Sequence, residues 1–93
     1  MSFIFEWDQN KSKENTRKHK VSFEEAKTVF NDPLSITIAD HAHSASEERF
    51  IDVGFSSRGR CLVVIYTERG SRIRIISSRL ATGKERRTYE EII

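Results

Sequence analysis

Residues 66–79 read YTERGSRIRIISSR and predict a β-hairpin whose second strand alternates arginine with isoleucine. Side chains of a strand point to opposite faces of the sheet with a period of two residues. Ile73 and Ile75 therefore share one face, and Arg72 and Arg74 share the other. A guanidinium group stays charged and binds phosphate through two hydrogen bonds at once. The alternation thus predicts one face that packs and one face that binds an anion.

The hairpin is predicted to end a meander of three strands over residues 49–55, 60–67 and 72–78, with turns at 57–59 and 69–70. A further strand is expected over residues 35–40, followed by a loop over 41–48. If both turns of the meander are even-numbered loops, the packing face comprises Ile51, Val53, Leu62, Val64, Tyr66, Ile73 and Ile75. The opposite face then presents Asp52, Thr67, Arg72 and Arg74.

The first predicted helix has no hydrophobic stripe. Residues 3–7 alternate as a short strand, and Asp8 is a good helix N-cap. No large apolar residue follows until Val21, so packing on a core cannot explain this helix. One flank of it carries Lys11, Asn15, Lys18 and His19. That flank is either a solvated face or a binding face.

Two more helices carry clear start signals. Ser22 and Glu25 have the capping-box spacing, and the second helix has an apolar stripe that suits a sheet surface, formed by Phe23, Ala26 and Phe30. It is expected to end at residues 31–33. Thr82 and Glu85 form another capping box at the start of a final helix.

Charge is unevenly distributed along the 93 residues, although the net charge is only +2. Residues 11–20 hold five basic side chains and one acid, residues 22–52 hold seven acids and two basic groups, and residues 58–87 hold nine basic groups and two acids. Two basic segments around an acidic middle suggest a localised anionic partner, phosphate above all. Ordinary solvated charge is the alternative.

Several classes of protein are excluded at this stage. No apolar run of 18 residues and no secretory leader is present, so a cytoplasmic protein without a membrane span is expected. The single cysteine, Cys61, lies in an apolar run and is expected to pack as a small hydrophobe. His41 and His43 form a weak metal site without a carboxylate or cysteine cluster, so loop structure or a partner contact is preferred for them.

A set of short motifs is spread in order along nearly the whole chain. We take residues 1–93 as a single domain. The motifs are Phe5-Glu6-Trp7-Asp8, Lys11, Asn15, Lys18-His19, Val21-Ser22-Phe23-Glu24-Glu25-Ala26, Phe30, Asp32-Pro33, His43-Ser44, Glu48-Arg49-Phe50, Gly59-Arg60, Tyr66-Thr67, Arg69-Gly70, Ile73-Arg74-Ile75-Ile76-Ser77, Arg79, Ala81-Thr82, Glu85-Arg86 and Tyr89-Glu90. Together they resemble the BrnT toxins of bacterial type II toxin–antitoxin systems. Lys20 and Ser78 depart from the family pattern, which has glycine and alanine there. Lys20 would have to adopt any left-handed conformation that glycine accepts freely.

The resemblance implies an α+β, RelE-like fold, with two N-terminal helices and a C-terminal helix around a mainly antiparallel sheet. It also implies metal-independent RNA cleavage that inhibits translation. The implied partner is a BrnA-like antitoxin with a ribbon-helix-helix domain. The complex would bind operator DNA only through this antitoxin. No cofactor is expected. The alternative is a non-catalytic nucleic-acid-binding or regulatory partner that kept the basic face.

Metal-free RNA cleavage needs a base for the ribose 2′-hydroxyl, cations for the phosphate charge and an acid for the leaving oxygen. The candidate catalytic residues are Arg74, Arg79, His19, Lys11 and Glu68, and the candidate RNA-binding residues are Arg69, Arg72, Lys18 and Arg86. Arg74 is the strongest candidate for phosphate stabilisation. Five of the others have a structural alternative: an ion pair with Glu85 or Glu90 for Arg79, a solvated charge for Arg72 and Lys11, a helix-end cation for His19, and an arginine partner for Glu68.

Overall fold

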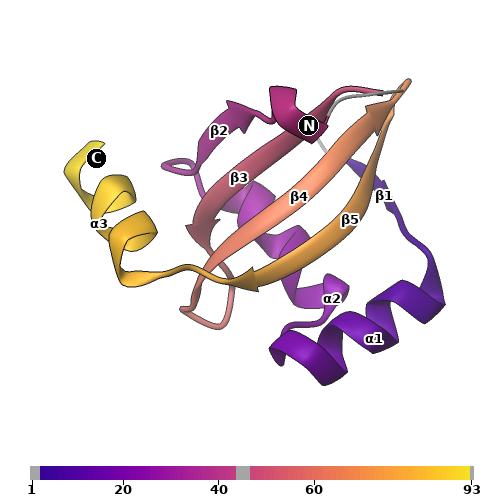
Figure 1. Cartoon of the computed structure of the whole chain (residues 1–93), viewed down its shortest axis with the longest axis horizontal. Coiled ribbons are helices and arrows are strands. Elements are labelled where there is room, and N and C mark those ends of the chain that lie inside the picture. Colours follow the sequence, from indigo (N-terminus) through magenta and orange to yellow (C-terminus); the bar gives the residue numbers. More distant parts are fainter. Residues whose placement is uncertain (1–2, 44–46, 93) are drawn as a thin grey trace.

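Five strands form one sheet in the order β1-β5-β4-β3-β2 in the computed structural model, which describes residues 3–43 and 47–92 (Figure 1). The strands are β1 (Ile4–Glu6), β2 (Ile36–Ala39), β3 (Arg49–Phe55), β4 (Cys61–Arg69) and β5 (Arg72–Leu80). The helices are α1 (Gln9–His19), α2 (Phe23–Ala26) and α3 (Gly83–Ile92), with 3₁₀ segments η1 (Lys27–Asn31) and η2 (His41–His43). Ser44, which belongs to one of the motifs quoted above, lies outside the described residues.

The predicted RelE-like fold class is wrong, and the expectation of a mainly antiparallel sheet fits only in part. The sheet is mixed, because β1 runs parallel to β5 at its edge, with Phe5 opposite Ile73 and Glu6 opposite Arg74. The pairs β2–β3, β3–β4 and β4–β5 are antiparallel. No local pattern reports a parallel pairing between segments almost 70 residues apart, so the sequence analysis had no means to place β1.

The second N-terminal helix is also shorter than predicted. After four α-helical residues the chain continues as the 3₁₀ segment η1. The Thr28 hydroxyl donates to the carbonyl of Glu25 at 2.6 Å and accepts from the backbone N–H of Ser57 at 2.9 Å. Side-chain bonds of this kind compete with the α-helical ladder, and β-branched Thr28 and Val29 favour it little. The tighter segment follows from this competition.

The two faces of the sheet bury different side chains. On the face covered by α1 and α2, the core comprises Val21, Phe23, Ala26, Val29, Leu62, Val64 and Ile75, with Phe5, Trp7 and Phe30 packed against it. On the other face, α3 covers a smaller cluster of Val53, Cys61, Val63 and Tyr89. Figure 1 shows α3 well apart from α1 and α2. Cys61 is buried as predicted, and this burial raises the pKa of its thiol.

The predicted faces are correct for β4 and β5 and wrong for β3. Phe55 pairs with Cys61, so the β3–β4 loop holds the five residues 56–60, an odd number. This shift places Ile51 and Val53 on the α3 face and turns Asp52 toward the face of Tyr66. The loop is held by Arg60, whose side chain donates to buried Glu25 and to the carbonyl of Lys20. Local turn residues do not reveal this tertiary anchor.

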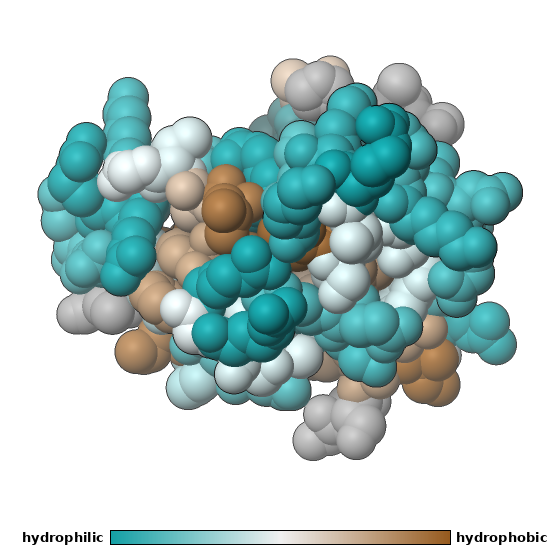
Figure 2. All heavy atoms as spheres, turned by 90° about the horizontal axis from the view of Figure 1, so that it is seen from below, coloured by the Kyte–Doolittle hydropathy of each residue, from teal (hydrophilic) through white to brown (hydrophobic). Residues whose placement is uncertain are grey.

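None of the helices in the described part of the chain has the length and hydrophobicity of a membrane span. Figure 2, which views the molecule from below, shows hydrophilic residues over most of that face and a smaller hydrophobic area between them.

Candidate nucleic-acid interface

Four arginines of β4 and β5 lie on the sheet face opposite α1 and α2, and we call the surface they form the arginine face. They are Arg69, Arg72, Arg74 and Arg79. Across β4 and β5, Arg69 pairs with Arg72 at the hairpin end, where Gly70 has the left-handed φ of +62° that a tight turn requires. The predicted separation of Arg72 and Arg74 from Ile73 and Ile75 is confirmed, since both isoleucines are buried on the other side.

A β-bulge in β5 brings Arg79 onto the same face as Arg74. These residues are five apart, so a regular strand would place them on opposite faces. Ile65 pairs with Ser77 and Tyr66 with Ile75, which leaves Ile76 as the extra residue. The bulge re-aims the strand so that Ser77 and Arg79 follow Arg74 along the arginine face, a common use of bulges beside functional sites.

Each of these arginines lies beside a carboxylate. Glu6 of β1 accepts from Arg74 at 2.8 Å and lies 3.9 Å from Arg72. Glu47 accepts from Arg69 at 3.1 Å. Because the partners are at least partly solvated, a phosphate group can compete with the carboxylates for the guanidinium groups. Until an anion displaces the carboxylates, the ion pairs orient the guanidinium groups on the sheet.

Arg79 makes the best-defined of these pairs. Its two terminal nitrogens donate to the two carboxylate oxygens of Glu85, each at 2.8 Å. This bidentate pair, together with the capping bonds to Thr82, lowers the pKa of Glu85 to about 2. The Arg79–Glu85 ion pair named as an alternative above is thus present, and it joins β5 to the start of α3.

A polar groove of about 180 Å³ runs between α1 and β5. Its lining residues are Lys11, Glu14, Asn15, Lys18, His19, Ile76 and Ser77. The groove exists because β1 pairs with β5 only at residues 72–74, beyond which α1 borders the strand. The cationic flank predicted for the first helix therefore faces the β5 bulge, beside the arginine face.

Asn15 holds α1 against the sheet edge. Its side-chain amide donates to the carbonyls of Ser78 and Val21, each at 2.8 Å, and its side-chain oxygen accepts from the N–H of Ser78 at 3.2 Å. It thus satisfies both backbone groups of Ser78, as a neighbouring strand would. These bonds explain how a helix without large apolar residues docks on the sheet.

Comparison with known proteins agrees with this geometry. Residues 7–85 match the family model described as "Ribonuclease toxin, BrnT, of type II toxin-antitoxin system". The chain belongs to the BrnT family. No curated protein matches it. Its structure is similar to the 1.1 Å crystal structure of the Brucella abortus ribonuclease toxin BrnT, with a TM-score of 0.68 and 21% sequence identity over 87% of this chain and 99% of that one. The fold is therefore BrnT-like, in place of the RelE-like fold expected above.

Lys20, where the BrnT pattern has glycine, adopts the conformation that glycine would. Its φ is +59°, and its N–H donates to the carbonyl of Thr16 at 2.9 Å to close α1. The Lys20 side chain reaches back to the carbonyl of Arg17 at 3.2 Å. α1 thus ends with a left-handed residue, and this conformation strains a non-glycine residue such as Lys20.

Two predicted site residues of this BrnT-family chain lie away from the β5 bulge. Glu68 points to the opposite face, where it lines a cavity with Tyr66 and Ile73, so it cannot act beside Arg74. Arg86 lies on α3, pairs with Glu90 at 3.2 Å and stacks over the Phe55 ring at 5.2 Å.

Among the described side chains, no group of three or more His, Cys, Asp or Glu residues could hold a metal ion. The side chain of His43 lies outside the described ones.

Sequence reasoning missed Glu6 and Ser77 as members of the site. Glu6 reaches the arginines only through the parallel β1–β5 register. Ser77 reaches the groove only through the bulge. Neither the parallel register nor the bulge has a local signal in a single sequence. The one available signal was that both residues lie within motifs that resemble the BrnT pattern.

Proposed function

We propose that this chain is the toxin of a type II toxin–antitoxin system, a single domain of residues 1–93 that cleaves RNA internally without a metal ion. The observation that carries the proposal is the convergence at the β5 bulge. Arg74 and Arg79 flank it on the sheet, and His19 and Lys11 border it from α1. Cationic and proton-transferring groups thus lie on two sides of one short strand segment.

In the proposed reaction, a phosphodiester lies on the arginine face beside Ser77. A base removes the proton from the 2′-hydroxyl, and the 2′-oxygen attacks phosphorus. The bond to the 5′-oxygen breaks as that oxygen receives a proton, which leaves a 2′,3′-cyclic phosphate and a 5′-hydroxyl. Arg74 and Arg79 stabilise the charge that builds on the phosphate oxygens.

The proton-transfer roles fall to the α1 side of the groove. His19 can serve as the acid or the base, since an imidazole can both donate and accept a proton. Lys11 is a second proton donor or a phosphate ligand, and Lys18 and Arg69 extend the basic surface for the flanking RNA. Arg72, whose side chain is 61% exposed, is the outermost contact.

The wider setting follows from the family. We propose that RNA cleavage in the cytoplasm inhibits translation, and that a BrnA-like antitoxin neutralises the chain. A ribbon-helix-helix domain of that antitoxin would bind operator DNA, while the toxin itself would not.

The test combines cleavage in vitro with growth in vivo. The purified chain, incubated with RNA in EDTA, should produce fragments that end in a 2′,3′-cyclic phosphate, and induced expression should arrest growth with fragmented RNA. Arg74→Ala should abolish both effects. Arg87→Ala, a matched change of an exposed arginine on α3, should abolish neither. Binding of RNA without cleavage or arrest would instead support the non-catalytic alternative, and cleavage only with added metal would remove the metal-free mechanism.

A further inference from the structure

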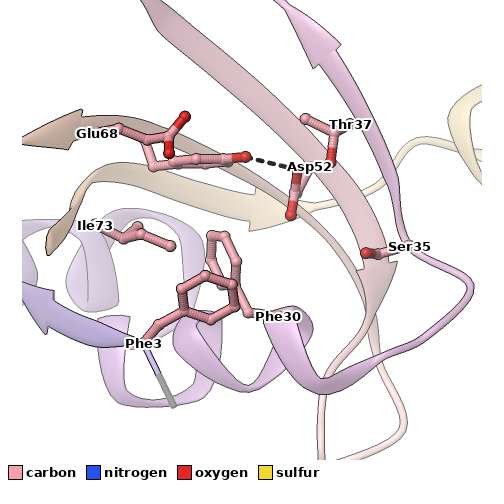
Figure 3. Close-up of a pocket in the computed structure, with 8 residues that line it drawn as sticks. Phe3, Phe30, Ser35, Thr37, Asp52, Glu68 and Ile73 are labelled. Carbon is pink, nitrogen blue, oxygen red and sulfur yellow. Dashed lines mark hydrogen bonds between the residues drawn. The ribbon is translucent and has the colours of Figure 1, made fainter. Parts of the chain in front are cut away.

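A second cavity lies on the sheet face opposite the arginines. It has a volume of about 240 Å³ and is lined by Phe3, by Ser35 and by residues from η1, β2, β3, β4 and β5. Figure 3 shows Phe3, Phe30 and Ile73 on one side of this space and Asp52 and Thr37 on the other. None of the candidate RNA-cleaving groups that border the β5 bulge reaches it.

Asp52 is the chemically unusual member of this cavity. Only 3% of the residue is exposed, yet it carries a carboxyl group. One oxygen, Oδ1, accepts from the Thr37 hydroxyl at 2.6 Å and from the Tyr66 hydroxyl at 3.2 Å. The other, Oδ2, accepts no hydrogen bond from any described residue, and the carboxyl group is turned into the cavity (Figure 3). No buried side-chain oxygen of the described residues lacks a hydrogen-bond partner, so Oδ2 is accessible from the cavity and can accept a bond from a group bound there.

The walls of the cavity suit a cation. The Phe30 ring meets Phe3 and Tyr66 edge to face, at centroid distances of 6.1 and 4.9 Å. Glu68 adds a second carboxylate at the exposed rim. No lysine, arginine or histidine is among the residues that line the cavity. Aromatic rings with two carboxylates and no opposing base attract a positively charged group.

We propose that this cavity binds the guanidinium group of an arginine side chain presented by a protein partner. A guanidinium is planar and weakly hydrated, donates two parallel hydrogen bonds to a carboxylate and stacks on aromatic rings, whereas an ammonium group is held more firmly by water. RNA offers no cation, so the occupant comes from the other partner class of a type II toxin, its protein antitoxin. The proposal rests on the functional assignment only for the existence of that protein partner.

The pH dependence of binding follows from Asp52. Burial raises the pKa of its carboxyl group, which the bonds from Thr37 and Tyr66 partly oppose. A bound cation favours the ionised form, so affinity should rise with pH as Asp52 loses its proton. The other titratable groups that line the cavity are Glu68 on the rim and Tyr66, whose pKa lies above its ordinary value through burial.

The test is an NMR titration of the full ¹⁵N-labelled chain with two blocked tripeptides, Gly-Arg-Gly and Gly-citrulline-Gly. Citrulline has the shape of arginine without the charge. The arginine peptide should shift the amide signals of Thr37, Asp52 and Ile73 with a Kd on the order of millimolar, as expected for one side chain. The citrulline peptide should leave these signals in place. Equal shifts from both peptides, or shifts confined to Glu47 and Glu85, would overturn the proposal.

Variants then identify the carboxylate that binds the guanidinium group. Asp52→Asn should weaken binding of the arginine peptide at least about tenfold, because its Oδ1 keeps both hydrogen bonds while the free oxygen becomes an amide nitrogen. Glu68→Gln should weaken binding less. Glu91→Gln, an exposed carboxylate on α3, is the matched control and should not change it. If Asp52→Asn fails to fold, the pair of peptides on the unmodified chain still decides the question, independently of any ribonuclease activity.

Discussion

Arg74→Ala should remove RNA cleavage while sparing the fold. The Arg74 side chain is 28% exposed and donates to Glu6, itself 26% exposed, at 2.8 Å. The contribution of an ion pair to stability depends on its burial, and surface pairs contribute up to about 1 kcal/mol. This pair is half-buried, so its loss should lower the free energy of unfolding by about 1 kcal/mol. Glu6 keeps Arg72 within 3.9 Å, which limits the cost.

The catalytic loss should be much larger than the stability loss. Removing one preorganised donor to developing charge typically lowers kcat about 100- to 1,000-fold. Arg74→Lys keeps the charge but loses the planar pair of donors, so we expect an intermediate loss of about tenfold. The measurements are single-turnover cleavage of a short labelled RNA and thermal unfolding of the same samples.

Glu6→Gln separates the two roles that Arg74 can have. If Arg74 acts on phosphate, this change removes a competitor for its guanidinium, and cleavage should stay equal or rise. If Arg74 serves only to anchor β1, then Glu6→Gln should lower cleavage as much as Arg74→Ala does. That result, or cleavage by Arg74→Ala within about fivefold of the unmodified chain, would refute the role assigned to Arg74.

Three further changes test the structure around the site. Lys20→Gly should raise the free energy of unfolding in urea by about 0.5–1 kcal/mol, because glycine accepts the positive φ without strain; no gain would argue against that helix end. Asn15→Ala should lower it by about 2–4 kcal/mol, since both backbone groups of buried Ser78 lose their partners, and a loss below about 1 kcal/mol would contradict the docking described for α1. The lowered pKa of Glu85 stabilises the fold above its ordinary value of 4.5, and this contribution is lost as pH falls toward about 2. Thermal unfolding of Glu85→Gln should therefore depend less on pH between those values, and an unchanged acid profile would show that the pair with Arg79 contributes little.

Much of the local structure could be predicted from the sequence because its causes are local. Asp8, Ser22 and Thr82 accept the N-terminal N–H groups of their helices as their spacing predicts. Trp7 and Phe23 pack edge to face, as expected of large aromatic side chains, which are usually mostly buried. These features depend on residues within a few positions of one another or on apolar surface that must be buried somewhere.

The site depended on causes that lie farther away. The odd β3–β4 loop is held by Arg60 and Glu25, which are 35 residues apart, and it decided the faces of Ile51, Val53 and Asp52. A parity argument assumes a regular loop length, whereas the real length follows from a tertiary ion pair. The sequence therefore predicts the kinds of side chain in the candidate site better than it predicts which residues lie together there.

The alternation of arginine and isoleucine in residues 72–75 determined, without any structure, that one face of the hairpin packs and the other carries charge. The period of a strand is a property of the backbone itself, so this division holds wherever the strand lies. Only the tertiary structure decided which groups meet there. The bulge at Ile76 brought Arg79 to Arg74, the parallel register supplied Glu6, and the side chain of Asn15 docked the cationic helix beside them. Register and docking depend on the balance of contacts between distant segments, and no single segment of the sequence contains that balance.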